Sequence, residues 1–237
     1  MRQILTSLTA VIFSFSPLMA QDDVQPSGKM KQFEGKVYGG YGTMYSDVPT
    51  TKNHMVYGAD FGYAVLPYLN IHLDLQTGKY KGGDRTSDRQ YYMEFTNQFF
   101  SAGILGKWYP LKMVSQPENK QNPTALKHFQ GLYISTGLGF HFNNVKAFNT
   151  SNPDIGYLNN NKDVNMYVPA ELGISYPIVH FGKEADASAS QRFLFVNVAY
   201  RYNFNFSDSW DGYDPALSSN QHNDASSVFL LGVGINF

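Results

Sequence analysis

The sequence contains no cysteine, and this absence excludes several kinds of protein. Without thiols there is no disulfide framework, no thiolate metal site and no acylated cysteine of the bacterial lipoprotein kind. Charged residues make up only 16% of the chain, and the net charge of −1 gives no indication of a nucleic-acid partner. No apolar run reaches the length of about 18 residues that a transmembrane helix requires. A chain of 237 residues without these features needs another source of stability, and a closed β-sheet is one.

The N-terminus has the organisation of a secretory signal peptide. Arg2 precedes a short apolar stretch from Ile4 to Phe15, and Ala20 is a small residue before a plausible cleavage point. We therefore predict a cleaved signal peptide over residues 1–20. Because Arg2 is its one charged residue, the mature chain keeps 17 of the 18 basic residues and all 19 acidic residues, a net charge near −2.

Segments with an apolar residue at every second position recur along the rest of the chain, which is rich in glycine, tyrosine and phenylalanine. The clearest is Leu69 to Thr77, where odd positions are apolar and even positions carry amide, imidazole and carboxylate groups. This alternation is typical of β-strands. Eight strands are predicted, at about 35–45, 55–65, 69–77, 90–108, 132–142, 164–176, 194–206 and 229–237.

The side chains of each strand alternate between two faces, and the two rows of side chains that result differ in an unusual way. One row is bulky and apolar, whereas the other combines glycines such as Gly58 and Gly62 with single charges such as Asp60. Both rows make sense if lipid surrounds the bulky row and the small, polar row fills a narrow interior. We therefore predict an all-β, eight-stranded, antiparallel up-and-down transmembrane β-barrel over residues 35–237, preceded by a short periplasmic segment over 21–34.

An even number of strands brings both termini to one side of the membrane. With that side in the periplasm, external loops fall near residues 46–53, 78–90, 143–163 and 207–225, of which the last two are long. Internal turns fall at 66–68, 110–129 and 177–190. Each internal turn contains a proline that ends a strand by removing a hydrogen-bond donor. Aromatic residues expected to form girdles at the membrane surfaces are Tyr57, Tyr63, Trp108, Tyr109, Tyr176 and Tyr202.

The mature chain resembles the OmpA/OmpX-type family of small outer-membrane barrels, in particular the single barrels without a peptidoglycan-binding domain. The most specific element of the resemblance is the alternating terminal row, which consists of Phe229, Leu231, Val233, Ile235 and Phe237. In the family such a row is an assembly signal. The resemblance implies a Gram-negative outer-membrane location, periplasmic chaperones and the barrel-assembly machinery as partners during biogenesis, and outer-membrane lipids around the barrel. It does not imply one activity.

The charges on the interior row form the candidate site. If the two strands around the turn at Pro67 pair so that both apolar rows share one face, Asp60 lies directly opposite Asp74. Two facing carboxylates repel each other unless a cation neutralises them. We predict an interior ion network made of Asp60, Asp74, Glu94, Glu171 and Arg201. Three interpretations remain open: pairing that only satisfies a polar interior, a gate that opens by re-pairing, and a proton or cation site.

Two strands are expected to be irregular. Pro169 falls on the inward row of the sixth strand, where its missing amide predicts a bulge or a local widening. In the fourth strand the apolar row changes sides after Phe99, which predicts a bulge between Asn97 and Ser101.

No catalytic arrangement is evident, because none of the six histidines belongs to the His-x-Ser pair carried by lipid A deacylases of this barrel size. We expect no enzyme activity, no cofactor and no metal. The leading hypothesis is a monomeric outer-membrane barrel with a plugged interior and an envelope-structural or surface-interaction role, its surface partner unspecified. The alternative is a conduit for small or apolar solutes, and a soluble lipocalin-like binder with a polar exterior is the third class.

Overall fold

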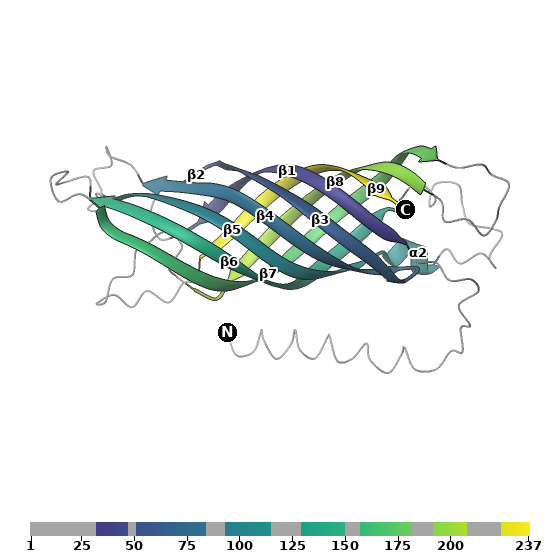
Figure 1. The fold of residues 1–237 in the computed structure, drawn as a ribbon, viewed down its shortest axis with the longest axis horizontal. Coiled ribbons are helices and arrows are strands. Elements are labelled where there is room, and N and C mark those ends of the chain that lie inside the picture. The colour runs from purple at the N-terminus through teal and green to yellow at the C-terminus, as the bar shows by residue number, and fades with distance from the viewer. Residues whose placement is uncertain are drawn as a thin grey trace. The chain divides into compact units, whose positions relative to one another are not determined.

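The computed structural model describes residues 32–46, 51–83, 93–114, 129–149, 157–181, 192–207 and 224–237 (Figure 1). The predicted signal peptide and most of the 21–34 segment lie outside the described residues. The elements are β1 (Phe33–Tyr45), β2 (Thr51–Lys52), β3 (His54–Leu66), β4 (Leu69–Gly83), β5 (Met93–Trp108), α2 (Pro110–Val114), β6 (Leu132–Asn149), β7 (Tyr157–Phe181), β8 (Arg192–Asn205) and β9 (Ala225–Asn236). Within these ranges, no helix is long and apolar enough to cross a membrane.

The long strands close into a ring of eight, as predicted. Around the ring the order is β4, β3, β1, β9, β8, β7, β6 and β5, with β5 pairing again with β4, and the two-residue β2 adds to the β4 edge. Every pairing is antiparallel. A closed ring leaves no long unpaired edge, which is the requirement for a sheet surrounded by lipid.

The last strand closes the ring against the first, which was the expected pairing. Val37 pairs with Val233 and Tyr41 with Phe229. At the end of this ladder Phe33 and Phe237 exchange two backbone hydrogen bonds of 2.8 and 2.9 Å. We call this the terminal end of the barrel; the C-terminus and α2 lie there (Figure 1). The opposite end, where β1, β4, β6 and β8 finish, is called the loop end.

Side chains alternate between a buried inward row and an exposed outward row. In β9 the contrast is sharp, because Leu230 is fully buried whereas its neighbour Leu231 is 56% exposed. The whole terminal row faces outward: Phe229, Leu231, Val233, Ile235 and Phe237 are all exposed. Polar and charged side chains such as Asn197 and Arg201 are buried inside. This arrangement excludes a lipocalin-like barrel, whose exterior is polar.

Several strands are longer than predicted. Strand β6 continues to Asn149 and β7 begins at Tyr157, so most of the expected loop over 143–163 is paired sheet, with Asn144 opposite Lys162. Strand β4 likewise reaches Gly83, and β7 continues past Pro177 to Phe181. The prediction was wrong because it equated a strand with apolar alternation, whereas a sheet that leaves the lipid can keep its pairing with polar side chains.

Strand β5 has no bulge in its middle, contrary to the prediction. Its pairing runs without a shift from Glu94 to Trp108 against β4, and equally against β6. The inward row therefore includes Phe95 and Phe99, which are buried. The apolar row had seemed to change sides because hydrophobicity does not distinguish an aromatic side chain that faces lipid from one that packs inside the barrel.

Pro169 interrupts the ladder between β6 and β7 without shifting its register. Pairing passes from Thr136–Ala170 to Gly139–Tyr167, so Gly137 and Leu138 face Pro169 and Val168 without ladder pairs. On its other side Pro169 still pairs with Asn203 of β8. Of the two expected outcomes, the bulge is absent, and the interruption of the ladder is the observed effect of the missing amide.

Candidate functional site in the barrel interior

Buried charges are gathered inside the barrel, nearer to its terminal end. We define this ion layer by eight residues: Glu34, Lys36, Asp60, His72, Asp74, Lys107, Glu171 and Arg201. None of them is more than 7% exposed, and they come from six of the eight long strands. Because ionised groups are very costly to bury without partners, their positions relative to one another decide what the layer can do.

Arg201 is the centre of one half of the ion layer. Its Nη1 and Nη2 donate to Asp74 Oδ2 and Oδ1 at 2.8 and 3.1 Å, a bidentate pair. Its Nε donates to Glu171 Oε2 at 2.6 Å. A guanidinium that holds two carboxylates in this fork geometry makes some of the strongest hydrogen bonds available to side chains.

Asp60 is the centre of the other half. Its Oδ2 lies 3.1 Å from Lys36 Nζ and 3.6 Å from Lys107 Nζ, and its Oδ1 contacts the Nδ1 of His72. Lys107 also reaches Glu34, with its Nζ 3.4 Å from Oε1. Asp60 and Asp74 face each other in the register expected from the sequence, but each carboxylate is neutralised by its own cations.

Neutral hydrogen-bonding groups join the charges to the rest of the interior. Tyr38 donates its hydroxyl to Asp74 Oδ1 at 2.8 Å, and Tyr133 donates to Glu171 Oε1 at 2.7 Å. Asn197 accepts from Lys36 Nζ at 3.2 Å and donates to the Tyr133 hydroxyl oxygen at 2.9 Å. The two halves of the layer are therefore parts of one polar network.

Glycines on neighbouring strands make room for the two tyrosines. A Cβ at Gly58 would collide with the ring of Tyr38, and one at Gly173 would lie 2.5 Å from the end of the Tyr133 ring. Each ring thus lies flat over a glycine and directs its hydroxyl at a carboxylate. The glycine-rich inward row seen in the sequence has this structural purpose at these two positions.

The ion layer contains four of the five predicted network residues. Asp60, Asp74, Glu171 and Arg201 come together, but Glu94 does not. It lies on the opposite row from the buried Phe95 and nine positions along β5 from Gly103, the residue that pairs with Asp74. Nine residues of strand correspond to about 30 Å. Its assignment to the interior was wrong because it depended on the bulge that β5 lacks.

Sequence reasoning missed Glu34, Lys36, His72 and Lys107. Glu34 and Lys36 alternate with Tyr38 on the inward row of β1, whose apolar alternation is weak. His72 precedes Asp74 by two positions on a clear polar row, so the spacing could have identified it. Lys107 lies on the row opposite to the outward Ile104 and Trp108, but its partners Glu34 and Asp60 lie on β1 and β3, which do not pair with β5.

A second group of interior side chains lies nearer to the loop end. This aromatic layer consists of His54, Tyr80, Phe99, His141 and Tyr167, one residue from each of β3 to β7, all buried. Successive ring centroids are 4.1, 4.5, 5.5 and 3.9 Å apart. On β4 the step from Asp74 to Tyr80 is six residues, about 20 Å along the strand, whereas on β7 Tyr167 is four residues from Glu171, about 13 Å.

Four of the six predicted girdle residues are exposed. Tyr57, Tyr63 and Tyr176 are 41–53% exposed and Trp108 is exposed as well, whereas Tyr202 is half-buried. Tyr109 is buried, and its ring lies 5.7 Å from that of Tyr133. Its assignment was wrong because the residue after an outward Trp108 belongs to the inward row. Whether the exposed residues lie at a membrane surface stays a prediction.

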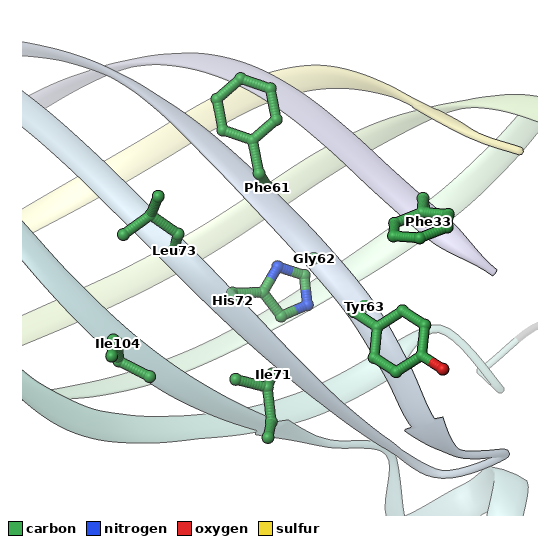
Figure 2. A pocket seen from close by; sticks show the side chains of 8 residues that line it. All are labelled: Phe33, Phe61, Gly62, Tyr63, Ile71, His72, Leu73 and Ile104. Atoms are coloured by element: carbon green, nitrogen blue, oxygen red, sulfur yellow. The ribbon is translucent and has the colours of Figure 1, made fainter. Parts of the chain in front are cut away.

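The outer wall carries a shallow apolar hollow of about 370 Å³ near the terminal end. Figure 2 shows side chains from β1, β3, β4 and β5 around it, including Phe33, Phe61, Leu73 and Ile104. The imidazole of His72 lies against Gly62 on the hollow's floor. Only the glycine backbone therefore separates this part of the ion layer from the outer surface.

A comparison with models of known families finds no match, and neither does one with curated proteins. Solved structures do match. The chain is similar to small outer-membrane barrels. Neisserial surface protein A is 12% identical, with a TM-score of 0.43 and coverage of 86% of this chain and 97% of that one. Ail, the attachment invasion locus protein of Yersinia pestis, is 8% identical, with a TM-score of 0.44 and coverage of 87% and 99%. The outer membrane protein OprG from Pseudomonas aeruginosa is 14% identical, with a TM-score of 0.43 and coverage of 87% and 97%.

Proposed function

We propose that the chain is an outer-membrane β-barrel protein whose interior is closed, with an envelope-structural or surface-interaction role presented at its loop end. The observation that carries the proposal is the ion layer. Arg201 on β8 binds Asp74 on β4, and Lys107 on β5 approaches Glu34 on β1, so both pairs join strands that are not neighbours in the ring. Contacts of this kind cross the lumen.

The outer surface supports insertion in lipid. Outward residues in β4 to β7 fall into apolar rows, for example Leu73, Ile104 and Leu138, which register with one another across the sheet. These side chains are 47–63% exposed. An apolar band on a closed barrel is stable where hydrocarbon replaces water. The location in the bacterial outer membrane, the periplasmic chaperones and barrel-assembly machinery as partners, and the monomeric state belong to the same proposal.

The proposal assigns no catalytic role to the interior. Each carboxylate of the ion layer is held by a cation of the same layer, with a nitrogen–oxygen distance of 3.4 Å or less. Groups held in this way serve stability and closure, since proton transfer to a substrate would require one of them to give up its partner.

A conduit for small or apolar solutes is the second candidate, and one feature favours it. The missing ladder pairs beside Pro169 leave a place where β6 and β7 are joined less firmly than elsewhere. An apolar solute could leave the barrel sideways there. Replacing Pro169 by alanine restores a backbone donor, so a conduit of this kind predicts slower solute transfer in the Pro169→Ala variant, whereas a closed barrel predicts no transfer in either protein.

Two experiments test the leading proposal. Cell fractionation is expected to place the protein in the detergent-extracted outer membrane, with a gel mobility that changes on boiling; recovery in the soluble periplasmic fraction would contradict it. Liposomes that contain the purified barrel are expected not to swell in isotonic solutions of small sugars. Swelling at rates typical of open porins would favour the conduit.

A further inference from the structure

Five exposed lysines lie together on the outward face of the barrel near its loop end. We define this lysine belt by Lys52 on β2, Lys79 and Lys81 on β4, Lys146 on β6 and Lys162 on β7. They are spread over more than 100 positions of sequence, and the strand pairing brings them to one side of the wall.

Strand register arranges the belt in two adjacent rows. In one row Lys52 pairs with Lys81, Lys81 with Thr96, and Thr96 with Lys146. In the other, Lys79 pairs with Gln98, Gln98 with Asn144, and Asn144 with Lys162. Neighbouring strands are about 4.8 Å apart, so the backbone positions of the five lysines span about 20 Å of the wall.

The belt borders directly on the apolar surface. The next row towards the terminal end contains Thr77, Phe100, Phe142 and Val164, in continuous register. Below it lie Leu75, Ala102, Phe140 and Met166. The change from apolar to basic therefore takes one step of two residues, about 7 Å along the strand. A lysine at such a boundary lays its methylene stem on the apolar surface and directs its ammonium to the headgroups.

Opposite charge is scarce on this face. Among the outward residues that the structure describes on β2 and β4 to β7, Glu94 is the one carboxylate, diagonal to Lys81 and Lys146. Five lysines against one glutamate leave a strong excess of positive charge. Like charges in adjacent positions destabilise a sheet unless an anion lies between them.

We propose that the lysine belt binds phosphate groups of anionic lipid headgroups in the leaflet that meets the loop end. The inference rests on the proposed membrane insertion and adds a specific lipid chemistry to one side of the barrel. Charge complementarity supports this occupant, because the belt begins where the apolar rows that face the hydrocarbon end, next to the headgroup phosphates. The contact also explains how five lysines remain close together.

The test measures lipid selectivity of the mature barrel reconstituted in phosphatidylcholine vesicles. Electron spin resonance with chain-labelled lipids gives the association constant of phosphatidic acid relative to phosphatidylcholine. The wild type is expected to prefer phosphatidic acid by at least several-fold. Each lysine removed in the series Lys79→Gln, Lys81→Gln, Lys146→Gln is expected to lower this ratio by up to about five-fold, since a basic residue near an anionic surface contributes about 1 kcal/mol.

Matched variants separate charge from packing. The triple replacement of Lys79, Lys81 and Lys146 by arginine keeps the charge and is expected to keep the selectivity. Lys112→Gln removes an exposed lysine at the terminal end, in α2, and is expected to leave the ratio unchanged. Heat-modifiable gel mobility first establishes that each variant has folded and inserted, so failure of insertion is distinguished from failure of lipid binding.

Three results would overturn the inference for an inserted barrel. The first is equal association of phosphatidic acid and phosphatidylcholine with the wild type. The second is unchanged selectivity in the triple glutamine variant. The third is loss of selectivity when inorganic phosphate replaces chloride at equal ionic strength, because this would assign the belt to free phosphate instead of lipid.

Discussion

The ion layer and the aromatic layer fill the same barrel in different ways. In the aromatic layer every ring contact joins neighbouring strands, from His54 on β3 through Tyr80 and Phe99 to Tyr167 on β7. These ring contacts follow the wall from strand to strand, and a neutral hydrogen bond of 3.3 Å from the Tyr80 hydroxyl on β4 to Ser226 Oγ on β9 reaches across the lumen. In the ion layer, the contacts of Arg201 with Asp74 and of Lys107 with Glu34 join strands that do not pair. The first layer is held mainly by neutral contacts along the wall, whereas the second crosses the lumen with charged pairs.

This difference has an energetic consequence. Ring contacts between adjacent strands add to backbone pairing that already exists. Each therefore stabilises the fold locally by about 0.5–1.5 kcal/mol, in addition to the contribution of its buried apolar area. The ion layer depends on mutual neutralisation, so removing one member leaves others charged and buried. We therefore expect substitutions in the ion layer to have larger and less additive effects than substitutions in the aromatic layer.

The largest effect is expected for Arg201→Met, which leaves Asp74 and Glu171 without the guanidinium that holds both. Loss of one partner from a buried ion pair costs about 3–5 kcal/mol. The measurement is the free energy of unfolding in urea, with the barrel in phospholipid vesicles. Adding Asp74→Asn and Glu171→Gln removes the stranded charges and is expected to restore most of the loss. Equal stability of wild type and Arg201→Met would show that the layer is not coupled as described.

A smaller loss is expected for Lys107→Met. Glu34 loses its ammonium partner, but Asp60 keeps Lys36 and His72. The expected cost is about 1–3 kcal/mol by the same unfolding measurement. A double-mutant cycle with Glu34→Gln gives the coupling directly, since the second substitution removes the unpaired carboxylate. Strictly additive effects of the two substitutions would contradict the pairing.

Phe99→Leu tests the aromatic layer. The Phe99 ring stacks on Tyr80 at 4.5 Å and meets His141 edge-on at 5.5 Å. Leucine has a similar hydrophobicity but cannot make these ring contacts, so the substitution is expected to lower the free energy of unfolding by about 1 kcal/mol. The same substitution at the lipid-facing Phe100 is the control and is expected to cost less. A loss as large as that of Arg201→Met would remove the distinction between the two layers.

The smallest effect is expected for Glu94→Gln, because Glu94 lies on the outward row and about 30 Å from the ion layer. Its free energy of unfolding is expected to stay within about 0.5 kcal/mol of wild type. The informative control is Glu171→Gln, which removes an interior partner of Arg201 and is expected to be clearly destabilising. Similar losses in both would restore Glu94 to the interior network.

The sequence was sufficient to predict the ring of eight strands and the residues at the centre of the ion layer. Regular alternation such as that of Leu69 to Thr77 determines which face is buried, and the parity of the turn at Pro67 then places Asp60 opposite Asp74. The remainder depended on information that alternation does not contain. Phe95 and Phe99 are as apolar as any lipid-facing residue, so their inward position follows only from the continuous pairing of β5.

The missed cations show the same limit. Lys36 lies on a row of weak alternation in β1, directly opposite Asp60. Lys107 contacts Glu34 on β1, a strand that does not pair with β5. Such contacts follow from the stagger of a closed barrel, which fixes which residues face each other across the lumen. Polar extensions such as residues 143–149 of β6 were missed because strand pairing continues where the apolar pattern stops.

Planar-bilayer conductance of the wild type and of Arg201→Ala tests the central claim, that the ion layer closes the lumen, most directly. We expect a silent wild type and measurable conductance steps in Arg201→Ala, and we expect a Phe99→Ala variant to remain silent because it leaves the ion layer intact. Conductance in the wild type, or equal silence of wild type and Arg201→Ala, would contradict it.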